Sequence, residues 1–248
     1  MADEPLQRPG PVRTWTLNDS SLTLTHDNGA TRVDAVAPDI LRVRVMPTGN
    51  PAPRRDWDPV LELPPAKLTA EQRGDELHLS AGVLSARLGL AEGTLAFESG
   101  DRGSFAADLE APSWRPMALE EIALEQTPEP ELPPGAASTA MFLHKRIAPD
   151  EAYFGFGQRT GRLDRRHRRL TNWTVDRSSP GHCRGNDNMY QSHPVLMGVR
   201  PGLAWGLYLH STWYSAFDAG AAREDMLTLL TLGGELDYYI FAGPTPAA

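Results

Sequence analysis

The sequence predicts an all-β protein built as an antiparallel β-sandwich, and three observations support this prediction. Apolar residues recur at every second position in segment after segment, which is the period of strands with one buried face. Turn signals separate these segments by about 8–12 residues, a spacing typical of sandwiches and barrels. No segment alternates strands with long helices, which argues against a parallel α/β sheet.

The expected strands of the N-terminal half follow from this period. Leucines alternate with threonines over residues 22–24, and the pair Asn28-Gly29 that follows is a strong signal for a tight hairpin turn. Over residues 41–45 leucine and valine alternate with arginine, and further alternating segments cover residues 77–79 and 84–90. Each of these segments is predicted to be a strand with one face in the core.

The C-terminal half continues in the same way, with one exception. Strands are expected at residues 205–209, after the turn at Pro201-Gly202, and at residues 236–240, after Gly233-Gly234. Residues 117–125 place three apolar side chains on one helical face, so a short helix is expected there.

Residues 1–248 are predicted to form a single domain. The proline-rich segment 127–140 cannot lie in a helix or a central strand, so it is expected to be a surface loop. Strand patterns of the same kind lie on both sides of it, which favours a loop inside one domain over a linker. Residues 1–12 are expected to be flexible.

The charge balance excludes several classes of partner. The net charge is −8, so no overall field attracts nucleic acid or anionic lipid. The basic run at residues 162–169 is short and contains Asp164, so a solvated or ion-paired turn is favoured over a phosphate or nucleic-acid site. No run of about 18 apolar residues is present, which predicts no membrane span.

No cofactor is predicted. His182, Cys183, Asp187 and His193 lie near one another in the sequence, but their spacing matches no established zinc site. Cys183 is the single cysteine, so nothing depends on an oxidising compartment. The N-terminal residues carry neither a basic nor an apolar segment of a leader, and the expected location is the cytoplasm.

Residues 153–246 carry a series of motifs in a fixed order. Phe-Gly-Phe-Gly-Gln-Arg occupies 154–159, an arginine-rich turn 165–169, Trp-Thr-Val-Asp 173–176, and Met-Tyr-Gln-Ser-His-Pro 189–194. Three further motifs follow at 202–208, 217–218 and 234–246. In this order the segment resembles the N-terminal domain of glycoside hydrolase family 31, which comprises retaining α-glucosidases and α-xylosidases.

The resemblance implies a β-sandwich of the galactose-mutarotase-like type, also called a supersandwich. In the family this sandwich precedes a (β/α)8 barrel and lends one loop to the sugar pocket of the barrel, which corresponds here to residues 172–190. By position, Asp176 would accept hydrogen bonds from sugar hydroxyls, and Tyr190 would lie near the sugar. Gln158 stands where the family has a glutamate, so a charge is lost there.

The resemblance also implies that both catalytic carboxylates lie on the barrel, so no catalytic residue is assigned here. The chain alone is expected to be inactive and to bind an α-linked sugar weakly. Two alternatives remain open, a stand-alone carbohydrate-binding module and a mutarotase-like sugar epimerase. The epimerase would use a histidine as acid or base, with His144, His167, His193 and His210 as candidates.

A partner surface is expected from an excess of aromatic residues near the C-terminus. In the family the sandwich packs beside the barrel, so a partly apolar face is expected here, available to a barrel or to a second copy of the chain. The residues predicted to supply it are Trp205, Trp213, Tyr214, Phe217, Tyr238, Tyr239 and Phe241.

Overall fold

The computed structural model describes residues 5–50, 64–121, 137–175, 189–243 and 245–247. Within these residues the all-β prediction is confirmed, because the strands form three antiparallel sheets. The only helical elements there are two short 3-10 turns, η1 (Gly100–Arg102) and η2 (Leu119–Glu121).

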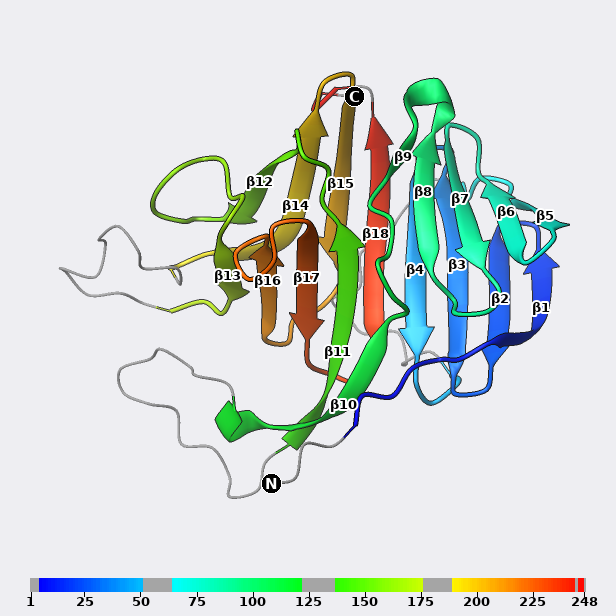
Figure 1. Ribbon diagram of the computed structural model, residues 1–248, viewed down its shortest axis with the longest axis horizontal. Coiled ribbons are helices and arrows are strands. Elements are labelled where there is room, and N and C mark those ends of the chain that lie inside the picture. The colour runs from blue at the N-terminus through cyan, green and yellow to red at the C-terminus, as the bar shows by residue number, and fades with distance from the viewer. Residues whose placement is uncertain (1–4, 51–63, 122–136, 176–188, 244, 248) are drawn as a thin grey trace.

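The largest sheet has eight strands and forms one layer of the sandwich (Figure 1). In spatial order its strands are β1 (Val12–Asn18), β2 (Ser21–His26), β3 (Ala30–Ala37), β4 (Ile40–Met46), β18 (Leu236–Gly243), β15 (Leu203–Leu209), β14 (Ser192–Arg200) and β12 (Ala152–Gly157). The C-terminal strand β18 therefore lies in the middle of the sheet, between β4 and β15.

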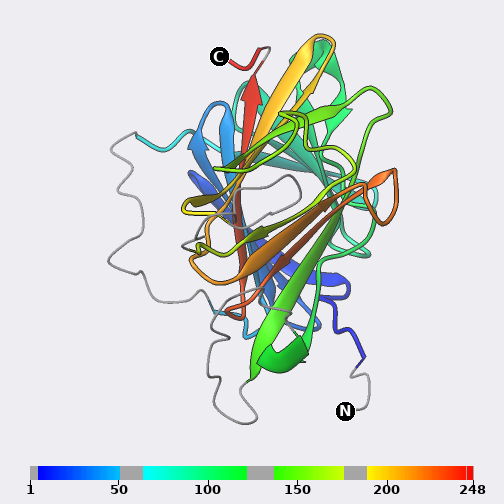
Figure 2. The same cartoon turned by 90° about the vertical axis from the view of Figure 1, so that its left-hand side faces the viewer.

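Two five-stranded sheets lie side by side over one face of this large sheet, and Figure 2 shows the layers from the side. The first contains β10 (Ser113–Ala118), β11 (Ala137–Arg146), β17 (Met226–Thr231), β16 (Ser215–Ala219) and β13 (Arg169–Asn172). The second contains β5 (Thr69–Arg73), β6 (Glu76–Ser80), β7 (Leu84–Gly89), β8 (Leu95–Ser99) and β9 (Ser104–Phe105). One continuous apolar core draws residues from all three sheets.

The alternating segments of the sequence are strands in the structure. Residues 22–24 lie in β2, 41–45 in β4, and 77–79 in β6. The tight turn at Asn28-Gly29 joins β2 to β3. In β4 the aliphatic residues at 41, 43 and 45 face the core and the two arginines between them face outward, which is the arrangement that the period of two predicts.

Two expectations about local structure differ from what is found. The short helix expected at 117–125 is absent from its described part, because β10 continues to Ala118 and only the turn η2 follows. β11 begins at Ala137, so the last four residues of the expected loop 127–140 belong to a strand, while 122–136 lie outside the described residues. Near the N-terminus, Gln7 forms an isolated backbone bridge with Trp114, and the flexibility expected of residues 1–12 stays a prediction.

The aromatic residues expected to supply a partly apolar face are exposed only in part. Of the seven residues expected there, Trp205, Phe217, Tyr238 and Tyr239 are buried, Tyr214 and Phe241 are half-buried, and only Trp213 is strongly exposed. The central position of β18 explains the burial of its two tyrosines on opposite faces. Tyr238 points into the core, and Tyr239 is covered on the outer face by the Arg42 guanidinium and the ring of Tyr208.

A buried ion pair joins the second five-stranded sheet to the first. The Lys145 Nζ in β11 donates to Asp108 Oδ1 at 2.7 Å and to the Ala106 carbonyl at 2.9 Å. The backbone N–H of Leu95 donates to the other oxygen of Asp108 at 2.8 Å. Burial lowers the pKa of Lys145 and raises the pKa of Asp108, and each charge opposes the shift in its partner.

Candidate functional site

The glycines of the Phe-Gly-Phe-Gly motif are required by a close approach of two backbones. β12 and β14 pair irregularly between Gly155 and Gly157, whose φ angles are 112° and 76°. A Cβ atom at Gly155 would lie 2.4 Å from the carbonyl oxygen of Val195, and one at Gly157 would lie 2.6 Å from that of Gln191. Only glycine combines these angles with the space available.

We therefore expect Gly155→Ala to lower the free energy of unfolding by about 2 kcal/mol, measured by urea denaturation. Roughly 1–2 kcal/mol reflects the unfavourable φ angle, and the displacement of β14 adds to it. Gly202→Ala is the matched control, because Gly202 has a φ of 77° but no atom within 4 Å of the added carbon. It should cost about 1 kcal/mol. Equal losses in both variants would show that the close approach is unimportant.

Phe156, between these glycines, connects the two layers of the sandwich. Its φ of 70° is unusual for a bulky residue. The side chain is fully buried, and its ring packs edge-on against Phe217 of β16 with 4.9 Å between ring centroids. Its carbonyl oxygen accepts a hydrogen bond of 2.8 Å from Arg159 Nε. This packing and the hydrogen bond offset the strain of the backbone.

Arg159 extends the connection to two further strands. Its Nη2 donates to Asn172 Oδ1 at 3.0 Å, and Asn172 Nδ2 in turn donates to Ser215 Oγ at 3.0 Å. Asn172 is the last residue of β13 and Ser215 the first residue of β16, and both are buried. The series of hydrogen bonds from Arg159 through Asn172 to Ser215 thus fixes the place where β13 ends and loop 172–190 begins.

Residues 173–175 and 189–191 form the neck of this loop. The backbone N–H of Val175 donates to the carbonyl of Met189 at 3.1 Å, and the N–H of Gln158 donates to that of Gln191 at 3.1 Å. The ring of Trp173 packs against Tyr214 at 6.1 Å between centroids. The two segments of the neck therefore lie side by side where β13 ends and β14 begins.

The predicted site residues are placed only in part. Tyr190 lies in the neck and is 38% exposed, so its ring is accessible from solvent. Asp176 and residues 177–188 lie outside the described residues. Gln158 is exposed, and its backbone rather than its side chain makes the bond to the neck. The sugar-binding roles of Asp176 and Tyr190 stay predictions.

The arginines of the run at 162–169 donate hydrogen bonds to backbone carbonyls, and one of them forms an ion pair. Arg165 Nη1 donates to the carbonyls of Arg162 and Thr160, and Arg166 Nη1 donates to that of Glu151 at 2.8 Å. Arg169 forms an ion pair with Asp218 at 3.3 Å. These guanidinium groups shape the turn between β12 and β13.

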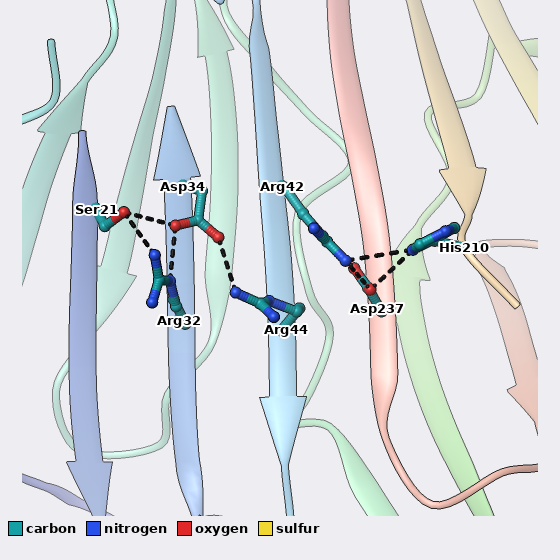
Figure 3. A network of polar contacts seen from close by, with 7 residues as sticks. All are labelled: Ser21, Arg32, Asp34, Arg42, Arg44, His210 and Asp237. Atoms are coloured by element: carbon teal, nitrogen blue, oxygen red, sulfur yellow. Dashed lines mark hydrogen bonds and ion pairs between the residues drawn. The ribbon is translucent and has the colours of Figure 1, made fainter. Parts of the chain in front are cut away.

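Buried and partly buried polar side chains on the outer face of the eight-stranded sheet form ion-pair networks (Figure 3). Arg42 donates to both carboxylate oxygens of Asp237, and His210 Nδ1 lies 3.0 Å from Asp237 Oδ2. Hydrogen bonds from Arg42 and His210 outweigh the effect of burial and lower the pKa of Asp237. A second network beside it consists of Ser21, Arg32, Asp34 and Arg44.

Three of the four histidines considered for an epimerase have partners inside the fold. His210 is 6% exposed inside the Arg42–Asp237 network, and His144 Nδ1 lies 3.0 Å from Thr228 Oγ1. His193 is exposed on β14, and the backbone of His167 pairs with Ala219.

In the part of the chain that the structure describes, no three His, Cys, Asp or Glu side chains could hold a metal ion, and no helix is long and apolar enough to cross a membrane. His182, Cys183 and Asp187 lie outside that part.

Among proteins of known sequence, the chain is similar to α-glucosidases. It is 43% identical over 99 residues to α-glucosidase 2 of Bacillus thermoamyloliquefaciens, a match that covers 39% of this chain and 12% of the relative. It is 25% identical over 104 residues to an α-glucosidase of Saccharolobus solfataricus, covering 42% of this chain and 15% of the relative. The matches thus span a small part of these longer proteins.

Solved structures share the fold over nearly the whole chain. A GH31 dextranase of Flavobacterium johnsoniae in complex with glucose superposes with a TM-score of 0.77 at 16% identity, over 96% of this chain and 27% of the dextranase. A GH31 α-xylosidase from a soil metagenome, in complex with xylose, gives 0.69 at 18% identity over 94% of this chain and 33% of the xylosidase. The model of the glycosyl hydrolase 31 N-terminal galactose mutarotase-like domain matches residues 30–218. The chain therefore belongs to this family of glycosyl hydrolase 31 N-terminal domains.

Proposed function

We propose that this chain is the non-catalytic N-terminal sandwich of a retaining α-glycosidase and that it contributes loop 172–190 to the sugar pocket of a catalytic barrel. The family match and the names of the relatives support the enzyme class. The observation that carries the role of the loop is its neck, which holds the half-exposed ring of Tyr190 on the end of the sandwich. An aromatic ring there can cover the apolar C–H face of a sugar.

In this proposal the chain supplies recognition and the barrel supplies chemistry. Retaining hydrolysis needs a nucleophile and an acid/base carboxylate about 5–5.5 Å apart on the two sides of the glycosidic bond. We assign neither carboxylate to this chain. Asp176 would accept hydrogen bonds from the sugar hydroxyls, and Tyr190 would pack on the ring.

The proposed partner is the catalytic barrel, because the relatives are several times longer than the matched segments. Self-association is the second candidate, but Trp213 is the only strongly exposed member of the aromatic set predicted for it. Light scattering at high protein concentration separates the two, since a stable dimer supports self-association. We propose the cytoplasm as the location, on the basis of the single cysteine.

We expect the chain alone to release no nitrophenol from nitrophenyl α-glucoside and to bind short α-glucosides with a Kd in the millimolar range. One loop encloses little of a ligand, whereas tight sites bury most of it. Titration calorimetry or NMR should show weaker binding for Tyr190→Ala and for Asp176→Asn. Trp213→Ala is the matched control, because its ring is exposed outside the neck.

Two outcomes would contradict the proposal. Nitrophenol release that survives both Asp176→Asn and repurification would place catalytic groups in the chain. Micromolar binding that depends on Trp213 and not on Tyr190 would instead support a stand-alone carbohydrate-binding module.

A further inference from the structure

Two backbone hydrogen bonds close the neck, but they do not by themselves fix it to the sandwich. The backbone N–H of Val175 donates to Met189 across the neck, and the N–H of Gln158 donates to Gln191, the residue before β14. Loop ends held only by a few such bonds open locally at little cost in free energy. The position of Tyr190 therefore depends on the contacts that hold Gln158 and residues 172–175 to the neighbouring strands β12, β13 and β16.

Arg159 reaches both of these anchor points. It follows Gln158 directly in the sequence, and its Nη2 donates to Asn172, the residue before the neck begins. Its Nε donates at the same time to the carbonyl of Phe156 at 2.8 Å. The planar fork of a guanidinium can serve two acceptors in fixed directions, which the single ammonium of a lysine does less well.

Asn172 passes this connection on to β16. Its amide donates to Ser215 Oγ, and the next residue, Trp173, packs on Tyr214, the residue before Ser215. A hydrogen bond and a ring contact thus hold successive residues of the two segments together. Removal of the Arg159 guanidinium would therefore separate Asn172 and Trp173 from the turn that carries Gln158.

We propose that Arg159 is the positioning residue of the loop neck: it holds residues 173–175 and 189–191, and with them Tyr190, in place on the sandwich. This assignment rests on the proposed function for its relevance to sugar binding, but the geometry of the neck can be tested without sugar. It also gives the family motif at 154–159 a physical role, because the glycines bring β12 against β14 and the arginine anchors the neck.

The test compares amide hydrogen exchange by NMR in Arg159→Ala, Arg159→Lys and the matched control Arg168→Ala. Arg168 belongs to the same turn, but its Nη1 donates to the carbonyl of Thr160 and not to the neck. We expect the amides of Val175 and Gln158 to exchange roughly 10- to 100-fold faster in Arg159→Ala, the range expected for a hydrogen bond from a charged group. Lysine should restore part of this protection, and Arg168→Ala should leave it unchanged.

The amide of Leu207 in the central strand β15 reports on the whole fold. Faster exchange at the neck with unchanged exchange at Leu207 supports the proposal. Unchanged neck exchange in both Arg159 variants, or equal acceleration at the neck and at Leu207, overturns it. If Arg159→Ala does not fold, the same comparison is made with Arg159→Lys.

Sugar titration of the same variants separates this inference from the proposed function. If the unmodified chain binds α-glucosides, Arg159→Lys should weaken the affinity several-fold and Arg168→Ala should not. If the unmodified chain binds no sugar but shows the exchange contrast, the proposed function fails and the positioning role stands. If it binds sugar with the same affinity in every variant, the positioning role fails and the proposed function stands.

Discussion

Replacing Lys145 by methionine is expected to lower the free energy of unfolding by about 3–5 kcal/mol, the range for breaking a buried ion pair by removing one partner. Lys145 is 1% exposed, and its ammonium also lies over the rings of Phe97 and Tyr238. Methionine replaces most of the aliphatic part of the lysine side chain but lacks the ammonium, so Asp108 is left with an uncompensated charge in the core. Urea denaturation at neutral pH measures the loss.

A double variant distinguishes the pair from simple loss of packing. In Lys145→Met with Asp108→Leu no buried charge remains, so much of the lost stability should return, since apolar replacement of a buried pair is often neutral or better. Arg73→Met is the control for an exposed pair, because Arg73 and Glu71 are both solvent-accessible, and it should change stability little. A double variant less stable than Lys145→Met alone would contradict this account.

Lys145 shows what could not be predicted from the sequence. In β11, Met141, Leu143 and Lys145 alternate toward the core. A lysine at the end of such a pattern normally marks the solvent side, and the strand is not among those predicted. Its partner Asp108 lies 37 residues away, and only the tertiary fold brings the two together. By contrast, the middle of β4 was predictable, because Arg42 and Arg44 point outward between the inward aliphatic residues at 41, 43 and 45.

The candidate site was predictable in its motifs but not in its construction. The residues at 154–159 could be matched to a family, and Tyr190 proves to lie in a neck at one end of the sandwich. The chain from Arg159 through Asn172 to Ser215 joins three segments that no local pattern connects. The burial of Tyr239 was not predictable for a similar reason, because alternation says which residues share a face but not that Arg42 covers this ring.

We expect Asp237→Asn to lower the free energy of unfolding by about 3 kcal/mol at neutral pH, the low end for breaking a buried pair, because Arg42 is partly exposed. Asp237 is 5% exposed, and burial alone would raise its pKa. Hydrogen bonds from Arg42 and His210 reverse this, so the pKa in the folded state lies below the ordinary value. Asparagine keeps the shape but loses the charge.

The sign of the pH dependence follows from this depressed pKa. The ionised carboxylate stabilises the fold fully above its unfolded-state pKa of about 4, and this contribution is lost as the pH falls through the lower folded-state pKa. The difference in stability between the unmodified chain and Asp237→Asn should therefore shrink as the pH falls below about 4. Urea denaturation of both chains at each pH measures it. Asp225→Asn, in an exposed pair with Arg223, is the control and should have little effect at any pH. A difference that grows as the pH falls below about 4 would show that the Arg42–Asp237–His210 network does not stabilise the ionised carboxylate.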